Sequence, residues 1–271
     1  MRVRHVPICS WILLAACVPN RIYRARVDGG QDASIVADAG SETDGGANDG
    51  AVADGRAAGP TWWIIADQGI TTVYGQISRW ADRSGDANDA FMTDPNRQPL
   101  LVANAVNGRP AVRFGGASSL DIRRTVNLNT FAIFIVGRND SSDGSISMIL
   151  GPAGREPNDQ IRWETATSIL VVGIGNEFAP TIAEVGNTRV YHLLTLRFDG
   201  SRLDTYRDGV LVGTTPATTN GLPFSFLSLG SYYSVLFMVG ELAEVLIYDR
   251  PLSDSAFAST NDYLRSKYAL P

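Results

Sequence analysis

The sequence predicts an all-β protein built as a two-sheet antiparallel sandwich and closed by a short C-terminal helix. From Trp62 onward, short runs of β-branched and aromatic residues are separated by Gly, Asn and Asp, which is typical of strands joined by tight turns. One of these separators is Asp208-Gly209, a favoured pair for a two-residue hairpin because both residues tolerate positive φ. Helical periodicity of about 3.6 residues occurs only after Ser253.

The expected strands follow one another along this region. In residues 189–198 apolar residues alternate, so we expect one face, with Leu194, Leu196 and Phe198, to be the core face. The sequence predicts strands at Trp62 to Ala66, Ala111 to Phe114, Phe131 to Gly137, Ile146 to Leu150, Gln160 to Thr165, Ser168 to Ile174, Arg189 to Phe198, Leu203 to Arg207 and Val210 to Gly213.

The predicted helix starts after Pro251, with Ser253 as its N-cap and Asp254 near the positive end of its dipole. Phe257 and Leu264 are spaced to lie on one face, which we expect to pack against the sandwich.

The N-terminus predicts export rather than a membrane-spanning helix. Basic residues precede an apolar run, Val6 to Leu14, that is far shorter than the ~20 residues needed to span a bilayer. The run ends in Leu14-Ala15-Ala16-Cys17, which resembles the lipobox of bacterial lipoproteins. That resemblance implies a signal peptide at 1–16 and lipidation of Cys17, and Val18 in place of aspartate favours the outer membrane. The alternative is an ordinary secretory signal, for which Leu-Ala-Ala is also suitable.

The sequence predicts a disordered acidic tether at residues 17–60 and a folded domain at residues 61–271. The segment from Asp28 to Pro60 is mostly Asp, Gly, Ala, Ser, Asn and Thr, too polar to form a core. An Asp/Gly calcium repeat is the alternative, but it requires a regular nonapeptide period that is absent. The chain has two cysteines, Cys9 and Cys17, so the domain has no disulfide. The net charge of −5, with both signs interspersed, argues against nucleic acid as a partner.

Three stretches, named at the end of this paragraph, together and in their order along the chain resemble the LamG-like jelly roll of the concanavalin A-like lectin/glucanase superfamily. The resemblance implies the sandwich fold and leaves function open, because that fold serves lectins, glycosidases, adhesion modules and spacers. At the position where the family has an aspartate, this chain has Gly115-Gly116, which puts the family's calcium site in doubt. The stretches are Trp80 to Ala90 with Asn107 to Gly116, Tyr191 to Gly209, and Leu229-Gly230 with Gly240 to Ser253.

No catalytic set is expected, so the sequence predicts that the protein is not an enzyme. Glycosidases on this fold have two carboxylates on one Glu-x-Asp-x-x-Glu strand, and a retaining pair lies about 5 to 5.5 Å apart. The nearest candidates, Glu241 and Glu244, point to opposite faces of a regular strand, so structural pairing of Glu244 is favoured. His192, the only histidine after the leader, is expected to be a hydrogen-bonded strand-end residue.

Two further groups of residues suggest binding. Asp82, Asp86 and Asn88 lie in an oxygen-rich loop that would suit a structural calcium ion, although a network of Asx turns is the favoured interpretation. No other cofactor is indicated. Trp163, Tyr232 and Tyr233 are candidates for stacking on a sugar, with a role in the core as the alternative.

These features predict a lipid-anchored, extracytoplasmic, non-catalytic module that binds carbohydrate or another cell-surface ligand. The alternatives are a structural or adhesion module that binds proteins of the envelope and, less favoured, a diverged polysaccharide hydrolase or lyase.

Overall fold

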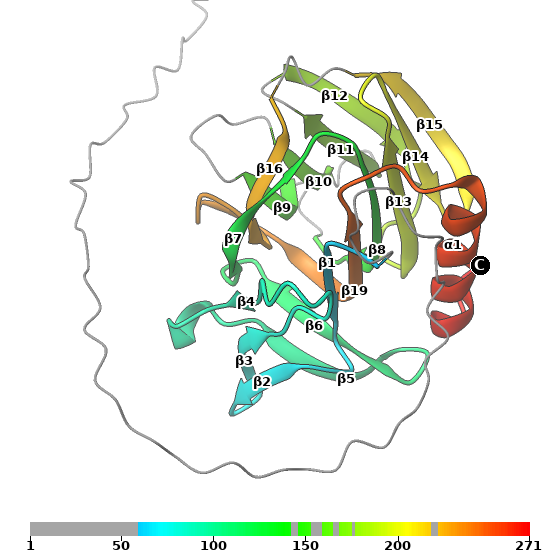
Figure 1. Cartoon of the computed structure of the whole chain (residues 1–271). Helices are drawn as coiled ribbons and strands as arrows, with labels where there is room; N and C mark the ends of the chain where they lie inside the picture. Colours follow the sequence, from blue (N-terminus) through cyan, green and yellow to red (C-terminus); the bar gives the residue numbers. More distant parts are fainter. Residues whose placement is uncertain (1–58, 142–145, 153–158, 165–167, 175–176, 218–221) are drawn as a thin grey trace, which may run out of the picture. The chain divides into compact units, whose positions relative to one another are not determined.

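Two antiparallel sheets stacked face to face form most of the chain that the structure describes (Figure 1). This structure is a computed structural model, and it describes residues 59–141, 146–152, 159–164, 168–174, 177–217 and 222–271. The predicted signal peptide, Cys17 and nearly all of the predicted tether lie outside these residues. None of the described helices is long and apolar enough to cross a membrane.

The first sheet has β19 (Val239–Tyr248) and β8 (Phe131–Asn139) at its centre, and the second continues from β7 (Leu120–Leu128) through β16 (Phe224–Leu229) to β12 (Glu177–Glu184). Every pairing among the described strands is antiparallel. In the first sheet, β15 (Val210–Pro216), β14 (Arg202–Arg207), β13 (His192–Phe198), β8 (Phe131–Asn139) and β19 (Val239–Tyr248) are neighbours, and β6 (Arg109–Gly115) and β1 (Trp62–Ile65) share the far edge of β19. In the second, β4 (Ala90–Phe91), β7 (Leu120–Leu128), β16 (Phe224–Leu229), β9 (Ile146–Pro152), β10 (Gln160–Glu164), β11 (Ile169–Ile174) and β12 (Glu177–Glu184) are neighbours.

Smaller elements complete one end of the sandwich. They are β2 (Ile70–Val73), β3 (Gln76–Trp80), the 3-10 helix η1 (Pro95–Arg97), β5 (Leu100–Val106), and the two-stranded hairpin of β17 (Ser231–Tyr232) and β18 (Leu236–Phe237).

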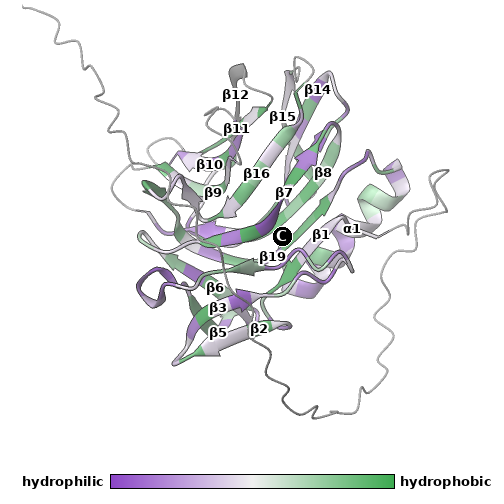
Figure 2. Cartoon of the chain, turned by 60° about the vertical axis from the view of Figure 1, so that its left-hand side comes forward, coloured by the Kyte–Doolittle hydropathy of each residue, from purple (hydrophilic) through white to green (hydrophobic). Residues whose placement is uncertain are grey.

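The main core lies between the two sheets and is made by alternate residues of each strand. Leu242, Val245 and Ile247 enter it from β19, and Ile161 and Trp163 enter it from β10. Hydrophobic residues follow β8 and β1 through the middle of the molecule (Figure 2). The predicted all-β sandwich with one C-terminal helix is therefore confirmed.

A second apolar cluster covers the outer face of the first sheet. Helix α1 (Asp254–Tyr268) places Phe257 and Leu264 there, as predicted, and Ser253 accepts the cap hydrogen bond from the Ala256 amide. The predicted core face of β13, with Leu194, Leu196 and Phe198, is confirmed, and helix α1 covers the opposite side of the strand. Leu193 and Thr195 on its other face are fully buried as well.

The predicted hairpin at Asp208-Gly209 is confirmed. It joins β14 to β15, and the two turn residues have φ of 51° and 81°, as a tight turn that matches the strand twist requires. The sequence did not predict strands β2, β3, β4, β5, β7, β12, β16, β17, β18 and β19. Strands β2, β5, β7 and β16 have exposed or irregular stretches that lack a clean two-residue period, and a register shift interrupts the alternation in β19.

Candidate functional site

The hairpin of β17 and β18 presents an aromatic pair at the surface. The rings of Tyr232 and Tyr233 meet edge to face, with centroids 4.7 Å apart. Tyr233 is 42% exposed, and Val235 beyond it is 69% exposed. Tyr233 and Ser234 both have positive φ, 47° and 58°, which makes the sharp tip. Two of the three aromatic residues predicted to bind sugar are therefore together on an exposed hairpin.

A polar row lies near this hairpin, on the outer face of β10. Arg162 Nη1 donates to Gln160 Oε1 at 2.6 Å, and its Nη2 donates to Glu164 Oε1 at 2.5 Å. Burial raises the pKa of Tyr232, and the positive charge of Arg162 opposes that rise, so the two side chains are electrostatic neighbours. The guanidinium is only slightly exposed and holds the row in place.

Trp163 does not belong to this surface, so the prediction that it stacks on a sugar was wrong. Successive residues of a strand point to opposite faces, so Trp163 enters the main core while Arg162 and Glu164 face outward. Its ring is 1% exposed and cannot meet a ligand. The alternative that the sequence left open, a role in the core, is correct.

The loop with Asp82, Asp86 and Asn88 forms a network of local hydrogen bonds. Asp82 Oδ1 accepts from the amides of Trp63 and Ser84, and Oδ2 accepts from the Ser84 hydroxyl and the Asn88 amide, all within 3.1 Å. The main chain of Asp86 accepts from an arginine, and Asn88 exchanges two hydrogen bonds with the Arg124 backbone.

Each of these contacts belongs to a turn network that secures the start of the domain. Among the residues described, no group of His, Cys, Asp and Glu side chains is placed to hold a metal ion. These hydrogen bonds fit the favoured interpretation of the loop as a network of Asx turns, and a structural calcium ion stays the untested alternative.

Glu241 and Glu244 lie on the same face of β19, so the expectation that they point to opposite faces was wrong. The register of β19 against β8 shifts between Leu242 and Glu244. Such a bulge adds one residue and reverses the alternation beyond it. As a result Leu242 and Val245 both face the core, and both glutamates face away from it.

Separate partners hold the two carboxylates. Glu241 accepts from Arg113 Nη2 at 2.5 Å, from Arg138 Nη2 at 3.3 Å and from the Tyr191 hydroxyl. Burial opposes ionisation of Glu241, but these three donors outweigh it and keep its pKa below the usual value. The side chain is 1% exposed, so it meets its own partners rather than solvent.

Glu244 is held under helix α1. It lies 3.0 Å from Lys267 Nζ and accepts from the Tyr268 hydroxyl and the Trp63 indole, each at 2.8 Å. Burial raises the pKa of this carboxyl in spite of the three donors, since its exposed fraction is 0%. The predicted structural pairing of Glu244 is confirmed.

His192 is also a structural residue. Its Nδ1 lies 2.6 Å from Asp208 Oδ2 and its Nε2 lies 2.9 Å from the Asn187 carbonyl, so both ring nitrogens are used. Asp208 also accepts from the Leu193 amide, which ties the β14–β15 turn to β13. The expectation of a hydrogen-bonded histidine at a strand end is confirmed.

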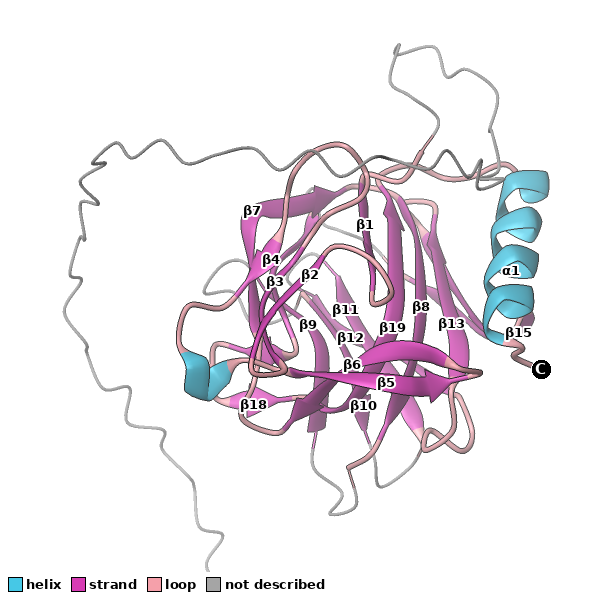
Figure 3. Cartoon of the chain, turned by 90° about the horizontal axis from the view of Figure 1, so that it is seen from below, coloured by secondary structure: helices cyan, strands magenta, loops and turns pink. Residues whose placement is uncertain are grey.

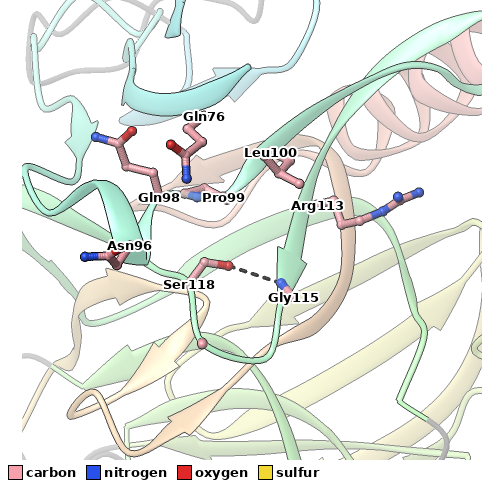
Figure 4. A pocket seen from close by; sticks show the side chains of 9 residues that line it. Gln76, Asn96, Gln98, Pro99, Leu100, Arg113, Gly115 and Ser118 are labelled. Atoms are coloured by element: carbon pink, nitrogen blue, oxygen red, sulfur yellow. Dashed lines mark hydrogen bonds between the residues drawn. The ribbon is translucent and has the colours of Figure 1, made fainter. Parts of the chain in front are cut away.

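Sequence reasoning missed a hollow of about 220 Å³ between η1 and the strands β3, β5 and β6 (Figure 4). No spacing pattern marks its residues, because they come from four separate elements that only the fold brings together. Amide side chains are the common feature of its wall. The hollow is lined by Gln76, Asn96, Gln98, Pro99, Leu100, Arg113, Gly115, Ala117 and Ser118.

A family model described as the concanavalin A-like lectin/glucanases superfamily matches residues 102–256, which is more than half of the chain. A search of curated proteins finds no match. Solved structures with a similar fold include Trypanosoma rangeli sialidase in complex with sialic acid (TM-score 0.53, 15% identity). The alignment covers 80% of this chain and 35% of the sialidase, so this chain spans about a third of that protein.

Two further structures align over similar shares of the chain. Domain 4 of AbnA, a GH43 extracellular arabinanase from Geobacillus stearothermophilus, in complex with arabinotriose, has a TM-score of 0.53 and 17% identity over 74% of this chain and 97% of that domain. The ligand binding domain of botulinum neurotoxin serotype D, in complex with N-acetylneuraminic acid, has a TM-score of 0.52 and 10% identity over 76% of this chain and 51% of that one. At these identities the likeness concerns the fold alone.

Proposed function

This chain belongs to the concanavalin A-like lectin/glucanase superfamily, and we propose that its sandwich is a non-catalytic module that binds carbohydrate through the hairpin of β17 and β18. The observation that carries this proposal is the aromatic pair of half-buried Tyr232 and exposed Tyr233 near the polar row of Arg162. Aromatic faces beside a few fixed polar groups are what a polar ligand with one apolar face needs.

The hairpin is rigid enough to present this pair. Gly151 of β9 lies so close to it that a Cβ there would be 1.8 Å from the Ser231 carbonyl oxygen. The tip is also held by Arg97, which donates to the Ser234 hydroxyl at 2.8 Å. A held aromatic pair loses little conformational freedom when a ligand binds, which favours affinity.

Ligands of proteins with this fold support the class of ligand. The three solved structures above contain sialic acid, arabinotriose and N-acetylneuraminic acid, which are all carbohydrates.

Burial of the acidic pair supports a non-catalytic role. A glycosidase needs two carboxylates that reach the scissile bond. Glu241 and Glu244 are 1% and 0% exposed and are held by their own basic and hydroxyl partners. We therefore extend the proposal to binding without turnover.

The N-terminal sequence supports a place outside the cytoplasm. We propose that Cys17 is acylated after removal of residues 1–16, and that residues 17–60 tether the domain to the membrane, with the outer membrane favoured. Mass spectrometry of the mature N-terminus tests this point. An N-terminus without acyl chains would refute the anchoring while leaving the binding proposal intact.

A glycan array with the folded domain tests the proposed function. We expect signals on a limited set of glycans and their loss in Tyr232→Ala and Tyr233→Ala, with Tyr74→Ala as the control because Tyr74 is a fully exposed tyrosine on a different turn. No signal for the wild type, or unchanged signals in both hairpin variants, would contradict the proposal.

An adhesion module that binds protein is the second candidate. It is favoured by the aliphatic part of the same hairpin tip, where Val235 and Leu236 are 69% and 38% exposed. Partners captured from envelope extracts that survive excess sugar and are lost in Val235→Ser would support this candidate over the lectin.

A further inference from the structure

The hollow beside η1 has the chemistry of a sugar subsite. Gln76 Nε2 donates to the Pro95 carbonyl at 2.9 Å, and Gln98 Nε2 donates to the Met92 carbonyl at 2.8 Å. These bonds fix both amides and leave each Oε1 to accept from a ligand hydroxyl. Exposed Asn96 adds a third amide. Pro99 and Leu100 add an apolar wall, which suits the C–H face of a sugar ring.

The charges of the hollow favour a neutral ligand. Among the described residues that line it, Arg113 is the only charged one, and Figure 4 shows its guanidinium extending away from Gln76, Gln98 and Ser118. That group is already paired with Glu241 at 2.5 Å. An acidic sugar would therefore find no unbalanced positive charge in the described wall of the hollow itself.

The size of the hollow limits its occupant to a small group. Its volume of about 220 Å³ lies below the range of about 300–1,000 Å³ that is usual for drug-sized ligands. One sugar residue of a longer chain is a suitable occupant.

The hollow and the aromatic hairpin are neighbours on one surface at this end of the sandwich. Asn96 in the wall is followed by Arg97, which donates to Ser234 at the hairpin tip. On the other side Gly115 pairs with Val239, the first residue of β19 after the hairpin. Figure 3 shows η1 next to β18. A ligand longer than one sugar residue can therefore contact both.

This surface lies at the end of the sandwich opposite to the point where the described chain begins. The amide of Thr61 donates to Ile247 near the end of β19, and Arg250 just beyond that strand donates to the Gly59 carbonyl. Gly115 instead pairs with the start of β19. The strand has 10 residues, which at about 3.3 Å per residue separates the two ends by roughly 30 Å.

We infer that the hollow lined by Gln76, Asn96 and Gln98 is a second subsite, which takes one residue of a neutral oligosaccharide whose neighbouring residue stacks on Tyr233. This inference rests on the proposed function and adds to it a ligand of more than one residue, without charge, bound at the end remote from residue 59.

A substitution that fills the hollow tests the inference. Gly115 lies in its wall at the end of β6, its φ is not positive, and a Cβ built there meets no atom within 4 Å, so Gly115→Leu should fold and occupy the hollow. Gly59→Leu is the matched control, since Gly59 is equally open and lies at the other end of β19. The probes are arabinotriose, cellotriose, laminaritriose and 3′-sialyllactose, each titrated by calorimetry after an array of neutral and sialylated glycans.

We expect Gly115→Leu to weaken binding of a neutral trisaccharide about tenfold and Gly59→Leu to leave it unchanged. Neutral binding that is lost in Tyr233→Ala but unchanged in Gly115→Leu would overturn the subsite while the proposed function stands. If the wild type prefers 3′-sialyllactose and Gly115→Leu abolishes that preference, the conclusion that the subsite takes a neutral ligand would be overturned. No binding of any arrayed glycan by the wild type would overturn both.

Discussion

The two buried glutamates of β19 should contribute very differently to stability, because their partners differ in exposure. Glu244→Gln leaves the Lys267 ammonium, whose side chain is only 10% exposed, without its nearer counter-charge and with only the Asp67 carboxylate at 4.0 Å to balance it. Breaking a buried pair costs about 3–5 kcal/mol. Burial already raises the pKa of Glu244, which means that the charged carboxylate is costly to desolvate. The neutral amide of glutamine does not carry this desolvation cost. We therefore expect a loss of unfolding free energy at the lower end of that range, about 3 kcal/mol.

Glu241→Gln should cost less. Its cations, Arg113 and Arg138, have side chains that are 46% and 29% exposed and can turn to water when the carboxylate is lost. We expect about 1–2 kcal/mol, between the value of an exposed ion pair and that of a hydrogen bond to a charged group.

Urea unfolding of the wild type and both variants at pH 7 measures these costs. For a domain of this size, 3 kcal/mol corresponds to a fall in Tm of roughly 6–12 °C. Lys267→Met added to Glu244→Gln should restore at least half of the loss, because it removes the stranded ammonium. A loss for Glu241→Gln that equals or exceeds that for Glu244→Gln, or no recovery in the double variant, would refute the reasoning.

Three further predictions concern acid stability, the hairpin and the oxygen-rich loop. The donors to Glu241 lower its folded pKa below 4.5, so its stabilisation is complete above that pH and is lost as pH falls through the folded value. The difference in unfolding free energy between wild type and Glu241→Gln should therefore shrink from pH 5 to pH 2, and a constant difference would contradict this assignment. Gly151→Ala should cost about 1–3 kcal/mol in urea unfolding because its Cβ meets the Ser231 carbonyl, whereas Gly115→Ala should be neutral; equal costs would contradict the close packing of the hairpin. Excess chelator should leave Tm unchanged, whereas Asp82→Ala should lower stability by about 1–3 kcal/mol, and a Tm that falls with chelator and returns with calcium would establish a metal site.

Much of the fold could be predicted because its signals are local. The turn at Asp208-Gly209 and the N-cap at Ser253 each depend on residues close in sequence, and both are present. The candidate site was predictable only in part. Tyr232 and Tyr233 do lie on an exposed hairpin, whereas Trp163, one residue from Arg162, is inside the core. Strand β10, which contains both Trp163 and Arg162, was predicted, but the sequence did not establish which of its two faces is covered by the core.

By itself the sequence predicted the all-β class, about half of the strands, the turn at Asp208-Gly209 and the C-terminal helix, and it shows that residues 61–271 contain no cysteine. Only the tertiary structure decided which face of each strand is buried, that a bulge places Glu241 and Glu244 on one side of β19, and that Gln76, Asn96 and Gln98 surround one hollow next to the hairpin. The physical reason is the range of the interactions. Turns and caps are decided by dihedral preferences over a few residues, whereas burial and register depend on strands that pair across more than a hundred positions of the chain.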